Sequence, residues 1–242
     1  MRLAIIFATL FTVTLSHAET LSIAMPLYNP PFIMSINKAH YTGFDIDITD
    51  EICRRLSVQC HFIPMGYGEL FASLSNGTVN LAIGAITITL ERDKQYLFSL
   101  PYMQSYGEYI VKYNSNLHSM SDIPGKTIGI ANASVYSNLL TNKYHDQITV
   151  KLYQFHADML LALENGDVDA LLLDKATAEY WYANSDKTYQ QLGDPVQLGY
   201  GYGILANRGE DALIAKINTA LLAMEADGTY LKIYNTYFSG GL

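Results

Sequence analysis

The sequence is poor in cysteine and in charge. Its two cysteines, Cys53 and Cys60, are too few for a disulfide-framework miniprotein or a cysteine-rich zinc module. Charged residues make up 16% of the 242 residues and hydrophobic residues 50%, which excludes a disordered tail and a charge-rich coiled coil. The formal net charge is −8 and no Lys/Arg-rich run occurs, so the electrostatic pattern of a nucleic-acid-binding protein is missing.

Sequence motifs of common catalytic and cofactor sites are missing as well. There is no Gly-x-Ser-x-Gly elbow and no His-Glu-x-x-His pair. Gly125-Lys126-Thr127 is similar to the end of a P-loop, but Met120 stands where that loop needs its first glycine. The histidines are scattered without the spacing of metal ligands. We therefore expect no catalytic residue, no metal and no cofactor.

Residues 1–18 have the pattern of a cleavable signal peptide. Arg2 precedes an apolar run from Leu3 to Leu15, and Ser16-His17-Ala18 is a small-x-small cleavage site. The run is shorter than the roughly 20 apolar residues that a membrane-spanning helix needs. We expect cleavage after Ala18 and export to the periplasm, with a retained N-terminal anchor as the alternative.

Export would place both cysteines in an oxidising compartment. Cys53 lies in the apolar-periodic stretch 46–56, and Cys60 begins the next strand-like run. We expect a Cys53–Cys60 disulfide across this short helix-to-strand turn. Two free buried thiols are the alternative.

Strand-like and helix-like segments alternate along the rest of the chain. Short apolar runs predict strands at 21–25, 61–64, 81–86, 109–112, 127–131, 150–153, 170–173 and 203–206. Helical periodicity predicts helices at 45–56, 67–74, 134–143, 157–165, 175–183, 210–228 and 229–238, with a short helix within 87–92. This alternation predicts an α/β fold with parallel sheets and crossover helices.

The order of elements begins again near residue 122, which predicts two similarly built lobes. Gly193, Gly199, Gly201 and Gly203 form a conformationally permissive segment that suits one crossing between the lobes. We expect the other crossing near residues 107–112.

Polar residues follow three of the predicted strands at their carboxyl ends, where open α/β sheets bind ligands. Thr87, Thr89 and Arg92 follow strand 81–86, Ser134 follows 127–131 and Asp174 follows 170–173. A guanidinium suits a carboxylate, which it can bind with two parallel hydrogen bonds, and an aspartate suits an ammonium group. Together these residues indicate a site for a zwitterion.

Each of these residues also has an ordinary structural role open to it. Arg92 could form an ion pair with Glu91 or Asp93, and Ser134 and Asp174 could each cap the helix that follows.

Several short segments of the chain occur together, in this order and spacing, in a known family. They are Asn29-Pro-Pro-Phe32, Gly43-Phe-Asp-Ile-Asp47, Leu81-Ala-Ile-Gly-Ala-Ile-Thr-Ile-Thr-Leu-Glu-Arg92, Phe98-Ser-Leu-Pro-Tyr102, Gly125-Lys126, Gly166-Asp-Val-Asp-Ala170 with Asp174, and Asp227-Gly-Thr-Tyr230. Through them the chain resembles the periplasmic amino-acid-binding proteins of ABC transporters. The resemblance implies a periplasmic-binding-protein type II fold, with lobe 1 at 19–108 plus 202–242 and lobe 2 at 109–201. Two hinge strands would join the lobes, and the ligand cleft would lie between them.

The resemblance also implies a set of ligand contacts. Arg92 would bind the α-carboxylate, assisted by Thr87 and by backbone amides at Ser134 and Val135. Asp174 and the carbonyl of Ala85 would hold the α-ammonium group.

Other matched positions would shape the pocket. Tyr67 would stack on the ligand side chain, and Asn29 stands where the family often has a second aromatic residue, a role that the neighbouring Tyr28 could take. Asp45 and Asp47 are similar to family residues with structural roles.

The arginine-binding branch is the most similar one, because it shares the cysteine pair and the ending Ala226-Asp-Gly-Thr-Tyr230. Two positions differ from that branch. Pro26 stands where binders of basic residues carry an acid, and Thr87 stands where the arginine branch has aspartate and glutamine binders have threonine. Glu69 and Glu108 are the candidates for a compensating acid.

The resemblance implies a monomeric protein that binds a free polar or basic L-amino acid, with arginine favoured, and delivers it to a membrane permease. We expect neither enzymatic activity nor nucleic-acid binding. A cyclohexadienyl-dehydratase-like enzyme and a ligand-binding signalling partner are the alternatives.

Overall fold

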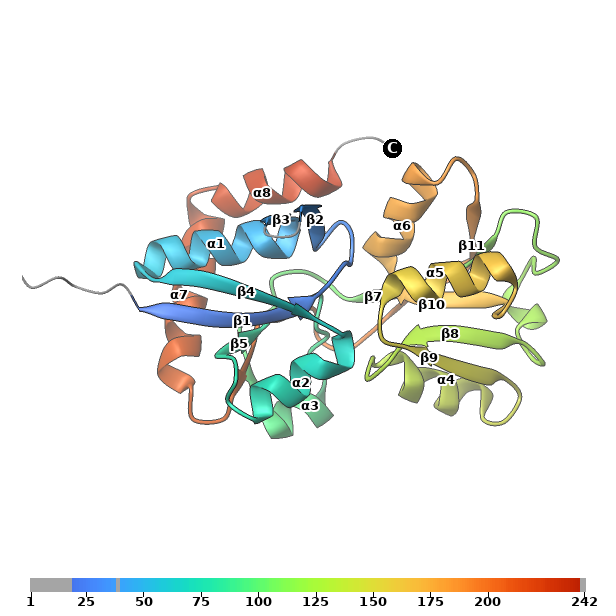
Figure 1. Cartoon of the computed structure of the whole chain (residues 1–242), viewed down its shortest axis with the longest axis horizontal. Coiled ribbons are helices and arrows are strands. Elements are labelled where there is room, and N and C mark those ends of the chain that lie inside the picture. Colours follow the sequence, from blue (N-terminus) through green and yellow to red (C-terminus); the bar gives the residue numbers. More distant parts are fainter. Residues whose placement is uncertain (1–18, 38–39, 240–242) are drawn as a thin grey trace, which may run out of the picture.

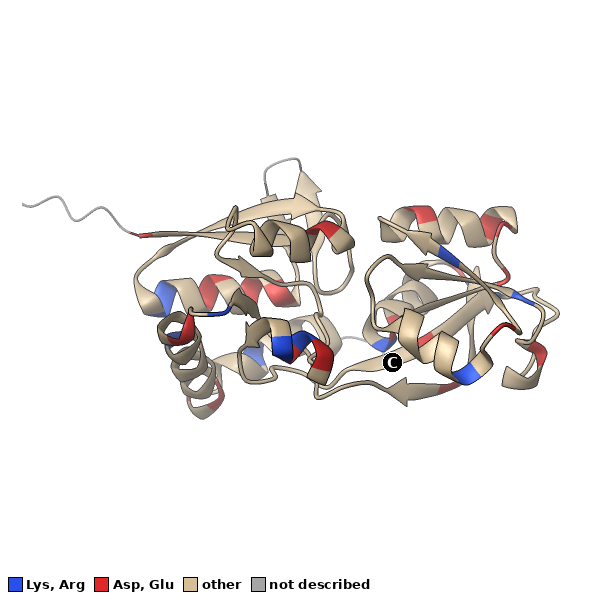
Figure 2. Cartoon of the chain, turned by 90° about the horizontal axis from the view of Figure 1, so that it is seen from below, with Lys and Arg blue, Asp and Glu red and all other residues tan. Residues whose placement is uncertain are grey.

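The computed structural model describes residues 19–37 and 40–239, so the predicted signal peptide lies outside the described residues. Two α/β lobes lie side by side, each built around a five-stranded sheet (Figure 1). The predicted fold class is confirmed. Acidic and basic residues are spread over both lobes (Figure 2). Within the described ranges, no helix is both long and apolar enough to cross a membrane.

The sheet of lobe 1 has the strand order β4-β1-β5-β12-β6. Its strands are β1 (Thr20–Pro26), β4 (Gln59–Met65), β5 (Leu81–Ala82), β6 (Tyr96–Phe98) and β12 (Leu205–Asn207). β1 runs parallel to β4 and β5, whereas β12 runs antiparallel to β5 and β6. The expected parallel pairing holds for β1, β4 and β5 but not for β12, which returns from the other lobe without a crossover helix.

Helices cover both faces of this sheet. They are α1 (Phe44–Leu56), α2 (Tyr67–Ser75), α3 (Leu90–Gln95), α7 (Asp211–Ala226) and α8 (Thr229–Phe238). Figure 1 shows α1 and α8 on one side of the sheet and α2 and α3 on the other. Ile46, Ile48 and Ile52 of α1 are buried against Ile23 and Met25 of β1, as the helical spacing of the isoleucines predicts. The hairpin β2 (Met34–Asn37) and β3 (His40–Thr42) precedes α1.

The sheet of lobe 2 has the strand order β11-β7-β10-β8-β9. Its strands are β7 (Tyr106–Lys112), β8 (Thr127–Ala131), β9 (Thr149–Tyr153), β10 (Ala170–Asp174) and β11 (Tyr189–Gln197). β8 is parallel to β9 and β10, and β7 is antiparallel to β10 and β11. The helices α4 (Tyr136–Tyr144), α5 (His156–Asn165) and α6 (Lys175–Asn184) cover it, and a 3-10 turn spans Met120–Asp122.

The central strand β10 is buried on both faces, so its sequence is a continuous apolar run. Leu171 and Leu173 pack in the cluster that contains Met159 of α5. Leu172 points the other way, into the cluster that contains Leu140 of α4. Asp174 follows this run at the strand's carboxyl end and is held there by the packing of its neighbours.

The chain crosses between the lobes twice, within 99–105 and 198–204, because the strands on either side of each segment belong to different sheets. The two crossings are hydrogen-bonded to each other: Tyr202 N donates to Met103 O at 2.8 Å and Leu198 N to Ser105 O at 2.9 Å. Gly201 has φ +105°, and a Cβ there would lie 2.6 Å from Met103 O, so this close approach requires glycine.

The expected first crossing at 107–112 is wrong, because these residues form most of β7, in which Ile110 and Val111 are fully buried. The predicted lobe boundary at 108/109 therefore falls inside β7. Gly193 also lies within a strand, at the irregular region of β11 between Leu192 and Val196.

Cys53 near the end of α1 and Cys60 at the start of β4 form a disulfide. This confirms the predicted pairing and excludes the alternative of two free thiols. The bond ties α1 to the edge strand of the lobe 1 sheet.

Candidate functional site

Arg92 contacts both lobes. Its Nη1 donates to Thr87 O at 2.8 Å within lobe 1, and its Nη2 donates to Ala133 O of lobe 2 at 2.9 Å. The guanidinium carbon lies 4.8 Å from the ring centre of Phe71 on α2, so the planar group is stacked as well as hydrogen-bonded. Among the ion pairs of the described residues, none joins Arg92 to Glu91 or Asp93, which is against the ion-pair alternative.

Thr87 supplies one of the two carbonyl groups that Arg92 contacts, and Ser134 follows the residue that supplies the other. Thr87 is buried, and its Oγ1 is 2.9 Å from the Oγ of Ser105 in the first crossing. Ser134 follows Ala133, and its Oγ is buried without a hydrogen-bond partner. The N-cap of α4 is Val135 and has no side-chain cap bond, so Ser134 does not take the predicted capping role. The backbone N–H of Ser134 donates to Ala131 O at 3.2 Å.

Asp174 is a buried carboxylate at the junction of the lobes. Its Oδ1 accepts hydrogen bonds from Tyr136 OH at 2.7 Å and from Tyr202 OH at 3.1 Å. It occupies the N-cap position of α6 but makes no side-chain cap bond, so the capping alternative fails. Burial raises the pKa of Asp174 to about 6, and the tyrosine hydroxyls, the Asn29 amide and the charge of Arg92 partly offset this rise.

Asn29 and Tyr28 lie against α6. Asn29 is fully buried and its Oδ1 accepts from Thr177 Oγ1 at 2.8 Å, while its Nδ2 is buried without a hydrogen-bond partner. The ring of Tyr28 meets that of Trp181 edge to face, with 6.4 Å between centroids. An amide and an aromatic ring of lobe 1 thus contact the same helix of lobe 2.

Tyr67 and Ala85 complete the set of predicted residues. Tyr67 opens α2 and is buried; burial raises its pKa, and the nearby charge of Arg92 opposes this rise. Ala85 follows β5 with φ +51°, a left-handed conformation that is uncommon for alanine. Its N–H donates to Asp45 Oδ2 at 2.8 Å.

Each of the two candidates for a compensating acid has a hydrogen-bond partner other than Arg92 or Asp174. Glu69 is exposed, and its Oε2 accepts from the N–H of Gly66 at 2.7 Å, capping its own helix. Glu108 is buried and accepts from Tyr182 OH of α6 at 2.7 Å.

The sequence did not indicate which tyrosines contribute hydroxyl groups to the site. Tyr136 and Tyr202 hydrogen-bond Asp174, and Tyr102 hydrogen-bonds Asp45 at 3.1 Å. With 19 tyrosines in the chain, composition carried no signal for these three. Tyr102 could have been singled out only through the matched segment Phe98–Tyr102.

The two lobes are closed over this site. Hydrogen bonds across the junction join Arg92 to Ala133, Thr177 to Asn29, and Tyr202 to Asp174. A backbone bond of 3.4 Å also runs from the N–H of Tyr67 on α2 to Gln154 O. The site therefore draws its groups from both lobes and exists as a unit only when they meet.

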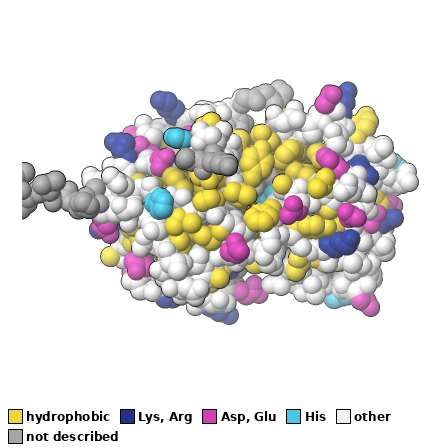
Figure 3. Space-filling model, viewed as in Figure 1, with side chains coloured by type: hydrophobic (Ala, Val, Ile, Leu, Met, Phe, Trp, Pro, Cys, Tyr) yellow, Lys and Arg dark blue, Asp and Glu magenta, His cyan; other side chains and the backbone are white. Residues whose placement is uncertain are grey.

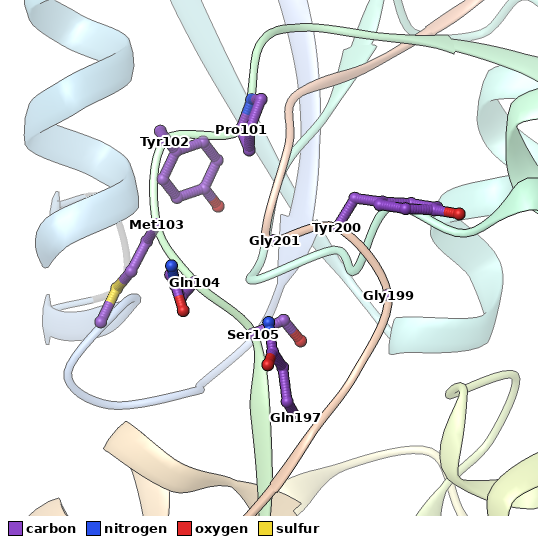
Figure 4. A pocket seen from close by; sticks show the side chains of 9 residues that line it. All are labelled: Pro101, Tyr102, Met103, Gln104, Ser105, Gln197, Gly199, Tyr200 and Gly201. Atoms are coloured by element: carbon purple, nitrogen blue, oxygen red, sulfur yellow. The ribbon is translucent and has the colours of Figure 1, made fainter.

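Two cavities border this set of residues, because Tyr102 lines the first and Tyr202 lines the second. One, of about 440 Å³, lies between the two crossings and is lined by Tyr102, Gln104, Gln197 and Tyr200 among others (Figure 4). The other, of about 720 Å³, is a groove between α6 and the aromatic face of α8. Figure 3 shows hydrophobic side chains gathered where the lobes meet on this face of the molecule. Within the described part of the chain, no cluster of three or more His, Cys, Asp or Glu residues could hold a metal ion.

Comparison with known proteins gives consistent matches over almost the whole chain. ABC transporter arginine-binding protein 1 of Escherichia coli K12 is 31% identical over 235 residues, which cover 94% of each chain. The crystal structure of an arginine transport system periplasmic binding protein from Legionella pneumophila is 41% identical, with a TM-score of 0.86, and covers 91% of this chain and 100% of the other. An ancestral arginine-binding protein bound to glutamine is 31% identical, with a TM-score of 0.85, and covers 92% and 99%.

The model of the bacterial extracellular solute-binding proteins, family 3, matches residues 21–240. This span includes both lobes, both crossings and every residue of the candidate site. The chain therefore belongs to the bacterial extracellular solute-binding proteins, family 3.

Proposed function

We propose that the protein is the substrate-binding component of an amino-acid ABC transporter and binds one basic or polar L-amino acid between its lobes, with arginine favoured. One observation carries this proposal: the Arg92 guanidinium, which bonds Ala133 O across the lobe junction, and the buried carboxylate of Asp174 lie at the same junction. A cation and an anion at one junction match the carboxylate and ammonium groups of a free amino acid.

The residues divide into two groups by the end of the ligand that they contact. Arg92, Thr87 and the Ser134–Val135 turn bind the α-carboxylate. The unpartnered buried Oγ of Ser134 supports this role, because a buried hydroxyl without a hydrogen bond is costly unless a ligand supplies one. Asp174 and the carbonyl of Ala85 bind the α-ammonium group.

The ligand side chain lies beyond these two groups, toward Tyr67, Tyr28 and Asn29. Tyr67 stacks on it, and the buried Nδ2 of Asn29, which also acts on Asp174, offers a donor at this end of the ligand. Arginine is favoured because the similar proteins named above are arginine-binding proteins. The ancestral protein bound to glutamine supports keeping a neutral polar side chain as the second choice.

Binding closes the lobes about the two crossings. The open form exposes one half-site on each lobe, and the ligand adds contacts to both, so binding shifts the population toward the closed form. The closed form is the one that a membrane permease recognises. Export to the periplasm through residues 1–18, action as a monomer and lack of enzymatic activity complete the proposal.

A ligand screen tests the proposal. The protein without residues 1–18 is unfolded and refolded to remove bound ligand, and thermal shifts are measured with each common amino acid at millimolar concentration. A ligand present at about 1,000 times its Kd adds about 4 kcal/mol, which raises the Tm of a protein of this size by roughly 10 °C. Such a rise with arginine, lysine or ornithine supports the proposal as stated, and one with glutamine replaces the favoured ligand.

Two further measurements distinguish a transport protein from an enzyme and from a signalling partner. No shift with any amino acid, together with turnover of prephenate, would replace the proposal with a dehydratase-like enzyme. Amino-acid binding without uptake of that amino acid in cells that also carry the neighbouring permease genes would favour a signalling partner.

A further inference from the structure

Asp45 is a buried carboxyl group directly behind the proposed ammonium site. It lies in the first turn of α1 and is 2% exposed. Its Oδ2 accepts hydrogen bonds from the N–H of Ala85 at 2.8 Å and from the OH of Tyr102 at 3.1 Å. Its Oδ1 is buried and has no hydrogen-bond partner. The backbone N–H of Gly84 also favours the ionised form of this buried carboxyl group, so Asp45 interacts with both residues of the Gly84–Ala85 turn.

Ala85 is the residue through which Asp45 reaches the site. It follows Gly84, and both have positive φ, +51° for Ala85 and +132° for Gly84. A left-handed alanine stores strain that the surrounding contacts must hold in place. The bond from the Ala85 N–H to Asp45 is such a contact: it fixes the Gly84–Ala85 peptide group, from which the Ala85 carbonyl extends by one residue.

Asp45 and Asp174 interact electrostatically across the junction. Each is buried, burial raises the pKa of Asp45 to about 7 and that of Asp174 to about 6, and the Asp174 charge contributes to the rise at Asp45. The ionisable groups that act on the pair from the surrounding elements are Arg92 of α3, Tyr67 of α2, Tyr102 and Tyr202 of the two crossings, and Tyr136 of α4. On α1 itself, Asp47 points elsewhere and accepts a hydrogen bond from Tyr237 OH at 2.6 Å.

We propose that Asp45 is a positioning residue for the ligand's ammonium group: it fixes the Gly84–Ala85 turn, whose carbonyl receives the ammonium, and adds its negative charge to that of Asp174. This inference rests on the proposed function. Arg92 is a cation whose charge lowers the pKa of Asp174, and two of its nitrogens are already engaged by backbone carbonyls. The ligand's ammonium group supplies the missing positive charge.

A proton linkage follows from this arrangement. In the closed protein without ligand, the two carboxyl groups hold protons at a pH where exposed carboxylates are ionised. An arriving ammonium group favours the ionised forms and displaces a bound proton. Binding therefore releases protons near pH 6 to 7, and affinity declines as the pH falls through this range, because the protonated carboxyls must first ionise.

Calorimetric titration tests the inference, with L-arginine as the first probe and L-glutamine as the second. Titrations at pH 5.5 to 8 in buffers of different ionisation enthalpy count the protons released. We expect Asp45→Asn to bind about tenfold more weakly at pH 7.5, equivalent to about 1.4 kcal/mol, and to release fewer protons than the unmodified protein. The matched control Asp47→Asn, two residues along the same helix, keeps the affinity and the proton count.

The outcomes separate the inference from the proposed function. If the unmodified protein binds an amino acid and Asp45→Asn matches it in affinity and proton release, the inference is overturned and the function stands. If the unmodified protein binds neither probe nor any other amino acid, the function fails and the inference with it.

A second variant serves if Asp45→Asn does not fold. Tyr102→Phe removes the hydroxyl donor to Asp45 and leaves the carboxyl and the backbone in place. Losing a hydrogen bond to the ionised form raises the pKa of Asp45 further. We expect the pH at which affinity declines to move upward in this variant, and an unchanged pH profile would overturn the inference.

Discussion

Replacing Arg92 with alanine separates binding of the ligand carboxylate from closure of the lobes. The guanidinium has five N–H donors and uses two of its nitrogens on Thr87 O and Ala133 O. A pair of charge-assisted hydrogen bonds to a ligand carboxylate is worth about 3–6 kcal/mol, so Arg92→Ala should weaken amino-acid binding by about 10² to 10⁴-fold.

Part of this loss comes from the contact between Arg92 and Ala133, which joins the lobes whether or not the ligand has a carboxylate. A double-mutant cycle removes that part. Titration calorimetry of both proteins with L-arginine and with agmatine, its decarboxylated analogue, gives the four affinities. In the unmodified protein, losing the ligand carboxylate should cost about as much as losing Arg92, less the part that comes from the Ala133 contact. In Arg92→Ala, losing the carboxylate should cost little.

A coupling energy below about 0.5 kcal/mol would refute the assignment of Arg92 to the carboxylate, because additive losses mean that the two groups do not meet. Arg54→Ala is the matched control. Arg54 pairs with Glu51 on α1, and its side chain is 69% exposed, so its removal should leave both affinities unchanged.

Three further predictions concern stability. The Cys53–Cys60 bond spans a sequence separation of 7, so chain entropy gives it about 2.5 kcal/mol; the double serine variant should melt roughly 5–10 °C lower, and an equal melting temperature would contradict the entropic estimate. Burial lowers the pKa of His156 to about 4, so the unfolded chain takes up a proton first as the pH falls below 6.5 and stability declines from there. Between pH 6.5 and 4, the free energy of unfolding from urea titrations should fall less steeply in His156→Gln than in the unmodified protein, by up to about 1.4 kcal/mol per pH unit. Parallel pH profiles would exclude this histidine as the cause. At Gly84, with φ +132°, an added Cβ would lie 2.3 Å from a proline ring atom, so Gly84→Ala should cost more than Gly77→Ala, where φ is +68° and the space is open; equal unfolding free energies would remove the packing argument.

The spacing of apolar residues predicted most helices and strands, because each buries its apolar side chains at the spacing typical of its type. The spacing of Ile46, Ile48 and Ile52 predicted α1, and the apolar run at 170–173 predicted β10, which is buried on both faces. β11 was missed because Gly193, Asp194 and Pro195 stand within it and are typical of turns. The position of the first crossing was missed for a related reason: β7 carries Gly107 and Glu108, yet it pairs along its length in the second sheet.

The candidate site was predictable where it depends on strand ends and not where it depends on packing between distant segments. Arg92 and Asp174 could be proposed from the ends of two predicted strands, and both lie at the lobe junction. The bond from Tyr202 to Asp174 depends on how the second crossing lies against lobe 2. The bond from the Ala85 N–H to Asp45 joins residues 40 apart in sequence. No local pattern encodes such pairings.

The division of the chain between the lobes also sets an order for folding. All strands of the lobe 2 sheet lie between residues 106 and 197, so that lobe has its whole sheet before the C-terminal region is available. Lobe 1 is incomplete until β12 pairs Leu205 with Ala82 and joins β5 to β6. When the chain is synthesised from its N-terminus, lobe 2 can therefore fold while the sheet of lobe 1 still lacks β12. Substitutions in α7 or α8 should accordingly slow maturation of the first-made segment, and chaperone dependence should end only when the last helices arrive.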